Sequence, residues 1–326
     1  MSWPLIIQAQ HDLPASEQRE WIQLNLSAWK ETLNTEGALL FRGLNIGGHP
    51  GFDRFSSLFG YDDFTYAESL SNAVRINLTP RVFTANEAPP HVEIYLHHEM
   101  AQTPSPPQKL FFYCESAAAE GGATPICRSD WVARDLMLEH PALFNRFLTL
   151  GLKYTTRMPS TDNAESGQGR SWRSTLGVQA PSEAEARLNR LGYRWHWRQD
   201  ETLEATTPVL PAVKTLSNGD RSFFNQAIAV HLGWQRVSDG RPNLTFGDDS
   251  SIPDVDLDVI VDIAKRHTTD LQWQDDDVAL IDNHRVMHGR KPYSGERKRR
   301  VLVTLALDPN RSLNKRSHSL EQASAP

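Results

Sequence analysis

His97-His98-Glu99 and, much later in the chain, Asp282-Asn283-His284-Arg285-Val286-Met287-His288-Gly289-Arg290 are the stretches that decide the expected fold. On an extended strand, side chains two positions apart point to the same side. His97 and Glu99 can therefore converge on one point, while His98 faces away and packs. A second imidazole, from His288 on a distant strand, would complete two histidines and one carboxylate on one face of a metal. This set leaves coordination positions open and suits non-haem Fe(II).

Further motifs stand in order around these ligands. The chain reads Pro-Gln-Lys-Leu-Phe-Phe-Tyr-Cys over 107–114, Gly-Gly-Ala-Thr over 121–124 and Gly-Arg-Lys-Pro-Tyr-Ser-Gly over 289–295. A basic run then leads into the apolar segment 301–305. In this order and spacing, residues 36 to 308 resemble the taurine dioxygenase and clavaminate synthase-like family of Fe(II)/2-oxoglutarate oxygenases.

The resemblance carries expectations about the fold and the metal. It implies an α+β, mainly β fold, a double-stranded β-helix (jelly-roll) barrel flanked by helices. It also implies that His97, Glu99 and His288 hold Fe(II). Glutamate is the usual carboxylate in the clavaminate synthase-like branch. Its presence argues against halogenation, because halogenating relatives have a small residue there that lets chloride bind.

The resemblance also makes 2-oxoglutarate the expected cosubstrate. The far carboxylate of 2-oxoglutarate needs a buried cation, and the planar fork of arginine suits it. Arg299, eleven residues after His288, stands where taurine dioxygenase relatives keep that arginine. Relatives with a more compact motif favour Arg297, so both arginines are candidates. Thr124 matches the family threonine that meets the same carboxylate.

Composition narrows the class of protein. The 326 residues are 39% hydrophobic and 23% charged, which predicts a soluble globular protein with an ample core. A net charge of −6 without a basic stripe argues against nucleic acid as a partner. The first residues lack a basic segment followed by a long apolar run, so we expect no signal peptide, no membrane anchor and a cytoplasmic location. We accordingly expect Cys114 and Cys127 to be reduced and packed in the core.

Periodicity outlines the elements along the chain. No repeat or Gly/Ser linker divides it, so residues 1–326 are expected to form one domain. The spacing of apolar residues predicts helices at 16–34, 50–59, 130–150 (with a break near Pro141), 182–191 and 255–266. Strands are expected at 38–41, 75–78, 94–100, 109–114 and 152–156. Beyond Pro309 the polar composition predicts a flexible tail over 310–326.

One polar segment is a candidate for substrate binding. Residues 159–173 lack periodicity and are rich in Gly, Ser and Asn, which predicts a loop, and long loops often act as lids. Arg170 and Arg173 could then meet an anionic group such as an amino-acid carboxylate. Asn225, in a segment that resembles a cavity-lining stretch of the family, is a further candidate.

These expectations converge on one reaction class. The sequence predicts an oxygenase that couples oxidative decarboxylation of 2-oxoglutarate to hydroxylation of an unactivated C–H bond. Within the family, this branch resembles enzymes that modify amino acids or their derivatives, free or tethered to a carrier protein, in secondary metabolism such as antibiotic biosynthesis. Desaturation or ring closure through the same hydrogen abstraction is an alternative. A zinc hydrolase could use the same three ligands but would not need the Gly-Gly-x-Thr motif and the paired arginine. A non-catalytic cupin-like binding protein would tolerate the loss of Glu99 or His288, and here all three ligands are intact. The oligomeric state is left open.

Overall fold

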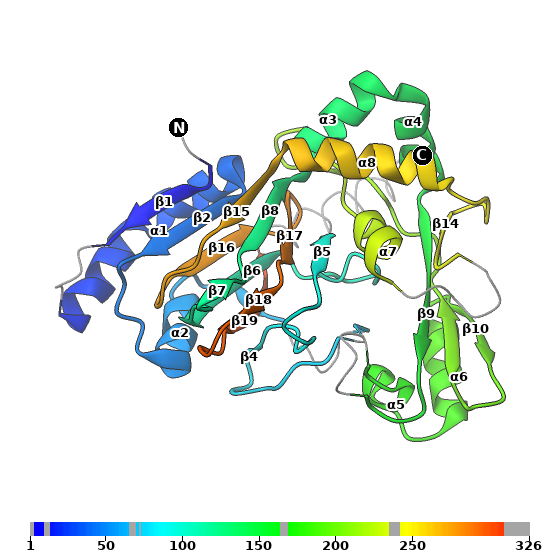
Figure 1. The fold of residues 1–326 in the computed structure, drawn as a ribbon, viewed down its shortest axis with the longest axis horizontal. Helices are drawn as coiled ribbons and strands as arrows, with labels where there is room; N and C mark the ends of the chain where they lie inside the picture. Colours follow the sequence, from blue (N-terminus) through cyan, green and yellow to red (C-terminus); the bar gives the residue numbers. More distant parts are fainter. Residues whose placement is uncertain are drawn as a thin grey trace, which may run out of the picture.

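The computed structural model describes residues 3–9, 14–64, 70–71, 73–163, 169–234 and 242–309 (Figure 1). The tail expected at 310–326 and residues 164–168 of the expected loop lie outside this part of the chain. Within it, helices surround several sheets, so the fold is mixed α/β.

The larger sheet contains seven strands. Along its main path these are β1 (Leu5–Gln8), β2 (Ala38–Arg42), β16 (Val278–Asp282), β6 (Lys109–Ser116), β19 (Arg300–Leu307) and β3 (Asp62–Asp63), and β4 (Val82–Thr84) also pairs with β19. β1 and β2 run parallel, and the other pairings are antiparallel. Strands from both halves of the chain therefore lie side by side.

The smaller sheet carries the first and last candidate ligands. Its order is β15 (Thr268–Leu271), β8 (Thr124–Arg128), β17 (Val286–Arg290) and β5 (Ile94–His97), all antiparallel. β7 (Glu120–Gly121) and β18 (Tyr293–Ser294) pair with each other as a separate two-stranded antiparallel sheet.

The two sheets share a hydrophobic cluster. Leu110, Phe112 and Cys114 alternate along β6 into this cluster, where they meet Ile126 and Val286 of the smaller sheet. Burying such apolar surface is the main favourable term in folding. Cys114 and Cys127 are both buried, which confirms the expectation that they pack in the core.

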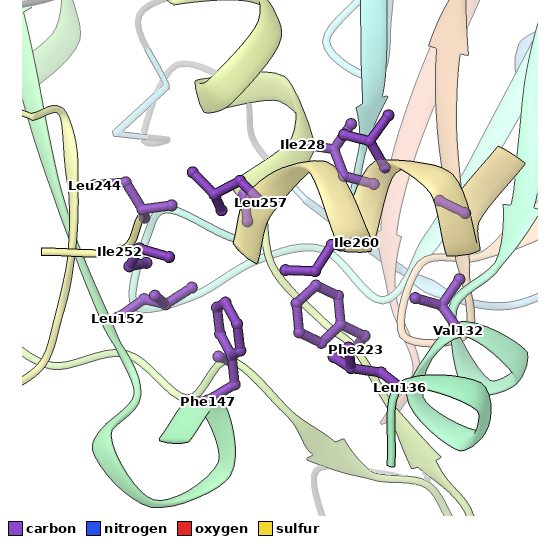
Figure 2. Close-up of a cluster of buried hydrophobic side chains, with 14 of the residues drawn as sticks. Val132, Leu136, Phe147, Leu152, Phe223, Ile228, Leu244, Ile252, Leu257 and Ile260 are labelled. Atoms are coloured by element: carbon purple, nitrogen blue, oxygen red, sulfur yellow. The ribbon is translucent and has the colours of Figure 1, made fainter. Parts of the chain in front are cut away.

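Helices cover the outer faces of both sheets. α1 (Ala15–Glu36) and α2 (Gly48–Ser57) pack against the larger sheet through a cluster that includes Trp29, Phe41 and Phe52. The smaller sheet is covered by α3 (Ser129–Glu139), α4 (Pro141–Leu150), α7 (Ala227–Gly233) and α8 (Asp254–Arg266). Figure 2 shows part of that second cluster, in which side chains from α8 approach those of α3 and α4.

A third group of elements lies beside the sheets. β10 (Arg194–Trp197), β11 (Leu203–Thr206), β9 (Leu152–Met158) and β14 (Leu244–Phe246) form another antiparallel sheet, against which α5 (Trp172–Leu176) and α6 (Pro181–Arg190) pack. β12 (Lys214–Thr215) and β13 (Arg221–Ser222) form a short hairpin.

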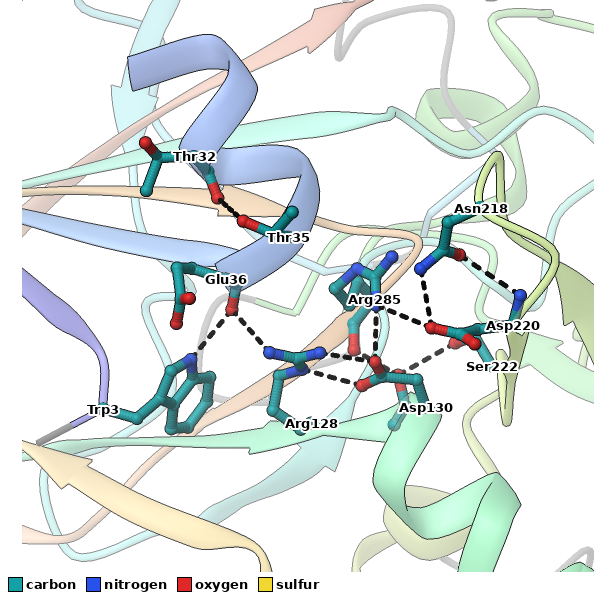
Figure 3. Close-up of polar contacts among 11 residues, drawn as sticks. Trp3, Thr32, Thr35, Glu36, Arg128, Asp130, Asn218, Asp220, Ser222 and Arg285 are labelled. Carbon is teal, nitrogen blue, oxygen red and sulfur yellow. Dashed lines mark hydrogen bonds and ion pairs between the residues drawn. The ribbon is translucent and has the colours of Figure 1, made fainter. Parts of the chain in front are cut away.

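A buried polar network ties the N-terminal helix to the strand that carries His288 (Figure 3). Asp130, at the start of α3, accepts hydrogen bonds from Arg128 at 2.5 Å and from Arg285 at 2.5 Å. Arg128 and Trp3 also donate to the carbonyl of Glu36 at the end of α1. Because a buried carboxylate is costly unless it is paired, these contacts fix the turn that precedes β17.

Three expectations about elements are wrong. Residues 75–78 form no strand, only an isolated bridge between Asn77 and Phe83, and the strand expected at 94–100 ends at His97. The helix α7 was not expected, because its seven residues are too few to show a clear period. No described helix is long and apolar enough to cross a membrane.

Candidate active site

His97 and His288 are direct cross-strand neighbours. The register of β5 and β17 places them opposite each other, and their ring centroids lie 4.4 Å apart. On β17, Val286 points into the cluster between the sheets and Met287 into the cluster on the helix side. His288 shares the face of Val286 by strand alternation, so its imidazole lies between the sheets.

Glu99 reaches the same point from a turn rather than from the strand. The chain leaves β5 after His97, and Met100 adopts a left-handed conformation with φ of 55°. Asn283 replaces the missing strand partner: its Oδ1 accepts from the Glu99 amide at 2.8 Å and its Nδ2 donates to the Glu99 carbonyl at 2.9 Å. The same Nδ2 donates to the carbonyl of Pro107 at 2.7 Å. The side-chain amide of Asn283 thus holds the backbone of Glu99 on both sides.

The three side chains offer one compact set of donor atoms. One atom each from His97, Glu99 and His288 lie within 4.8 Å of one another, and His288 Nε2 is 3.5 Å from Glu99 Oε2. His97 Nδ1 contacts the carbonyl of Tyr95 at 2.8 Å, which assigns the proton to Nδ1 and leaves the Nε2 lone pair available. Two imidazoles and a carboxylate in this arrangement match the donor set that Fe(II) takes in oxygenases.

Electrostatics favour the protonation states that a metal requires. Burial, with a contribution from His288, lowers the pKa of His97 to about 4, so this imidazole is neutral near pH 7. Burial alone would raise the pKa of Glu99, but the charge of Arg75 and the contact with His288 hold it well below its usual range. Arg75 Nη2 lies 2.9 Å from both carboxylate oxygens of Glu99. A neutral imidazole and an ionised carboxylate are the forms that bind metals.

His98 is directed away from this set. Its Nδ1 lies 2.5 Å from the carbonyl of Asn283, and its ring packs 4.6 Å from that of Phe224. Burial lowers the pKa of His98 well below its usual value, so it is a neutral packing residue.

Arg299 and Thr124 come together at another part of the same cavity. Arg299 donates from Nε to the carbonyl of Gly122 at 2.8 Å and from Nη2 to Thr124 Oγ1 at 3.3 Å. Trp273 also donates to that hydroxyl at 2.9 Å. Gly122 has φ of 70°, and a Cβ there would lie 2.9 Å from the Arg299 side chain, so both the backbone and the space require glycine.

Arg299 is a buried cation that has no carboxylate partner among the described residues. Only 8% of its surface is exposed. Burial, together with the nearby charge of Arg290, lowers the pKa of Arg299 to about 10, so it remains charged at neutral pH. A buried charge needs a counter-charge, and the open cavity beside it is where an anion would supply one.

Arg297 is not brought to this cavity. It pairs with Asp275 on the surface, and about half of its side chain is exposed. Between the two candidate arginines, the geometry favours Arg299.

The cavity joins these two groups of residues. It holds about 830 Å³ of empty space, counting the part open to solvent. Besides the ligand set, Thr124 and Arg299, its wall includes Arg75, Gln102, Gln226 and Trp234.

The three expected substrate residues do not line this cavity. Arg170 donates to the backbone carbonyls of Ser71 and Ser174, and Arg173 donates to that of Ser160. Asn225 is buried, with its amide donating to the carbonyl of Ala212 and accepting from the amide of Ala227. Their polar groups are directed at the backbone, so the expectation that they meet substrate is not supported by their positions.

Three residues of this region were missed by the sequence analysis. Asn283 belongs to the quoted motif, but its link to Glu99 spans 184 positions and leaves no local signal. Arg75 lies in an irregular segment where periodicity says nothing about direction. Gln102 lies three residues after Glu99, in the turn that follows β5. Its closeness in sequence to the predicted metal ligands was the signal that could have identified it.

Comparisons with known proteins agree with this geometry. Residues 6–305 match the model of the family described as taurine catabolism dioxygenase TauD, TfdA family. A clavaminate synthase-like protein of Arabidopsis thaliana is 36% identical over 278 residues, covering 84% of this chain and 82% of that protein. The dapdiamide synthesis protein DdaC of Enterobacter agglomerans is 28% identical over 291 residues, covering 86% and 84%.

Solved structures support the fold. A taurine dioxygenase from Burkholderia xenovorans superposes with a TM-score of 0.52 at 14% identity, covering 93% of this chain and 86% of that one. The PvcB protein of Pseudomonas aeruginosa gives 0.51 at 12% identity, covering 94% and 86%. Because the family model spans nearly the whole chain, the chain belongs to the TauD/TfdA family and is an Fe(II)/2-oxoglutarate-dependent dioxygenase.

Proposed function

We propose that this enzyme hydroxylates an unactivated C–H bond of an amino acid or amino-acid derivative. The observation that carries the proposal is the meeting of His97, Glu99 and His288 in one cavity with Arg299, a buried cation without a carboxylate partner in the described chain. A zinc hydrolase has use for the three ligands but none for that arginine.

In this proposal each residue has a defined task. His97 Nε2, His288 Nε2 and one oxygen of Glu99 hold Fe(II), and Arg75 and Asn283 keep Glu99 ionised and in place. Arg299 and Thr124 bind the far carboxylate of 2-oxoglutarate. When bound, the iron would activate O2, one atom of which enters succinate as 2-oxoglutarate loses carbon dioxide and the other the new hydroxyl group of the substrate. The protein binds and orients the reactants and excludes water.

The architecture fits the same proposal. The two sheets that share the central hydrophobic cluster would form the double-stranded β-helix, with the metal ligands on its smaller sheet and the turn beyond β5. We further propose that residues 1–326 act as one domain.

The names of two relatives support the substrate class. One relative is named as clavaminate synthase-like and another for dapdiamide synthesis, which favours a tailoring step in the biosynthesis of a small molecule. The substrate would be a small molecule, either free or tethered to a carrier protein.

The test is turnover with defined components. Protein purified without added metal is supplied with Fe(II) and 2-oxoglutarate, and succinate is measured with and without each proteinogenic amino acid. We expect stimulation by an amino acid and a product that gains one oxygen atom by mass spectrometry, and His97→Ala should abolish both. A protein that retains zinc and consumes no 2-oxoglutarate would refute the proposal.

A further inference from the structure

Gln102 is a buried side-chain amide on the wall of the active-site cavity. Only 7% of its surface is exposed, and its Oε1 is buried without a hydrogen-bond partner among the described residues. A buried amide oxygen that accepts no hydrogen bond costs about 1–3 kcal/mol. The site therefore holds an acceptor without a donor, and because Gln102 lines the cavity, a ligand bound there can supply one.

The turn that carries Gln102 is held firmly. Ala101 donates its amide to the carbonyl of His98 at 3.2 Å, and Thr103 donates both its amide and its hydroxyl to the carbonyl of Met100 at 2.9 and 2.8 Å. Gln226, the other glutamine of the cavity wall, differs from Gln102. Its side-chain amide nitrogen donates to the carbonyl of His98 at 3.0 Å. The backbone on both sides of Gln102 is therefore held, while its side-chain amide makes no hydrogen bond within the described part of the chain.

Arg75 supplies a cation on the same wall. Its side chain is 6% exposed, and Nη2 meets Glu99. Arg75 contacts the carboxylate of Glu99, whereas Arg299 contacts the carbonyl of Gly122 and the hydroxyl of Thr124. The cavity thus has two cationic regions, one at the ligand set and one at Arg299. The planar guanidinium can serve two carboxylates at once.

We propose that Gln102 and Arg75 form the subsite for the head group of a free α-amino acid, with Arg75 binding its carboxylate and Gln102 Oε1 accepting from its ammonium group. This inference rests on the proposed function and makes it more specific. A substrate tethered to a carrier protein as a thioester has no carboxylate at that position for Arg75 to bind. The subsite therefore selects the free acid over the tethered form.

The experiment compares ligands that differ by one group. Protein loaded with Mn(II) and 2-oxoglutarate under anaerobic conditions, where no turnover occurs, is titrated calorimetrically with each proteinogenic L-amino acid. The tightest binder is then compared with its methyl ester, its N-acetyl derivative and its N-acetylcysteamine thioester. We expect the free acid to bind at least about 30-fold more tightly than the ester or the thioester, because a charge-assisted pair is lost.

Two variants assign these preferences to residues. Arg75→Gln should reduce the preference for acid over ester to within about threefold, because the ester has no carboxylate that could pair with the guanidinium of Arg75. Gln102→Leu should weaken the free acid about tenfold and remove its advantage over the N-acetyl derivative. Because each ratio is measured within one variant, a change in metal affinity cancels. Thr103→Val is the matched control, since it alters the same turn away from the cavity and should preserve both ratios.

Every other outcome overturns the inference. Tighter binding of the thioester, binding of no amino acid, unchanged ratios in the two variants, or equal loss in Thr103→Val would each do so. Succinate formation from Fe(II) and 2-oxoglutarate is measured in parallel, with and without amino acids. If it persists, the oxygenase assignment survives the failure of this subsite, and if it is absent, the proposed function itself has failed.

Discussion

Replacing Arg299 by alanine should specifically weaken the binding of 2-oxoglutarate. Arg299 is 8% exposed and donates to Gly122 and Thr124, so a carboxylate beside it would form a desolvated, charge-assisted pair. Losing one partner of such a pair costs about 2–5 kcal/mol. At 1.4 kcal/mol per tenfold change, the Kd for 2-oxoglutarate should rise at least about 30-fold. Arg299→Lys keeps the positive charge but loses the planar guanidinium that can donate two parallel hydrogen bonds to a carboxylate. We therefore expect an intermediate effect, a rise in Kd of about tenfold.

Arg297→Ala is the matched control, because Arg297 lies two positions away and pairs with Asp275 on the surface. Exposed ion pairs contribute about 0–1 kcal/mol, so its Kd should change less than about fivefold. The assay is an anaerobic titration of the Fe(II) protein with 2-oxoglutarate, followed by the visible charge-transfer absorbance of the chelate. Thermal unfolding checks that each variant is folded. An Arg299→Ala protein that binds 2-oxoglutarate as tightly as the wild type, or an equal loss in Arg297→Ala, would refute the reasoning.

Three further predictions concern the metal set. His97→Ala should lose the bound metal ion, whereas His98→Ala should keep one metal per chain and lose only stability. Metal analysis of both variants tests this. The reverse result would show that His98, not His97, is the metal ligand. Asn283→Ala should lower metal affinity about 10–100-fold in a Mn(II) titration, because Glu99 loses the amide that orients it, and an unchanged affinity would exclude that role. The metal-free protein should lose stability as pH falls from 6.5 toward 4: the pKa of His97 is lowered to about 4 on folding, so the unfolded chain binds more protons in that window. Urea unfolding measures this, and His97→Phe should flatten the slope.

The ligand set could be predicted from sequence even though part of the reasoning was wrong. His97 lies on a strand, as expected, and pairs with His288 across it. Glu99 does not follow that strand, so alternation is not what brings it to the metal site. The turn at Met100 and the side chain of Asn283 place it there instead. The motif identified residues that the fold brings within reach of one another, while the contacts that create this arrangement come from residues far apart in the chain.

The two candidate arginines show where periodicity stops being informative. Val301 and Val303 of β19 point into the cluster between the sheets, and strand alternation would place Arg299 on the same side only if the strand continued regularly back to that position. The register shifts between Arg300 and Val301, and the chain before Arg299 is a bend after Gly295, whose φ is 92°. Alternation therefore cannot be carried back to Arg297. Deciding between the two required knowing where the strand begins, and sequence patterns locate strand ends poorly.

Substrate residues were the hardest to predict, because an arginine's role depends on what its donors reach. Arg170 and Arg173 stand in a polar segment that suggested a lid, yet their guanidinium groups donate to backbone carbonyls of neighbouring segments. Arg75 has no motif around it and still reaches the ligand set. The residue type is the same in these cases, and tertiary contacts separate a cation that contacts loop carbonyls from one that lines a cavity. For this chain, the groups that choose the substrate are better sought among buried side chains such as Gln102, whose polar atoms the fold itself leaves unused.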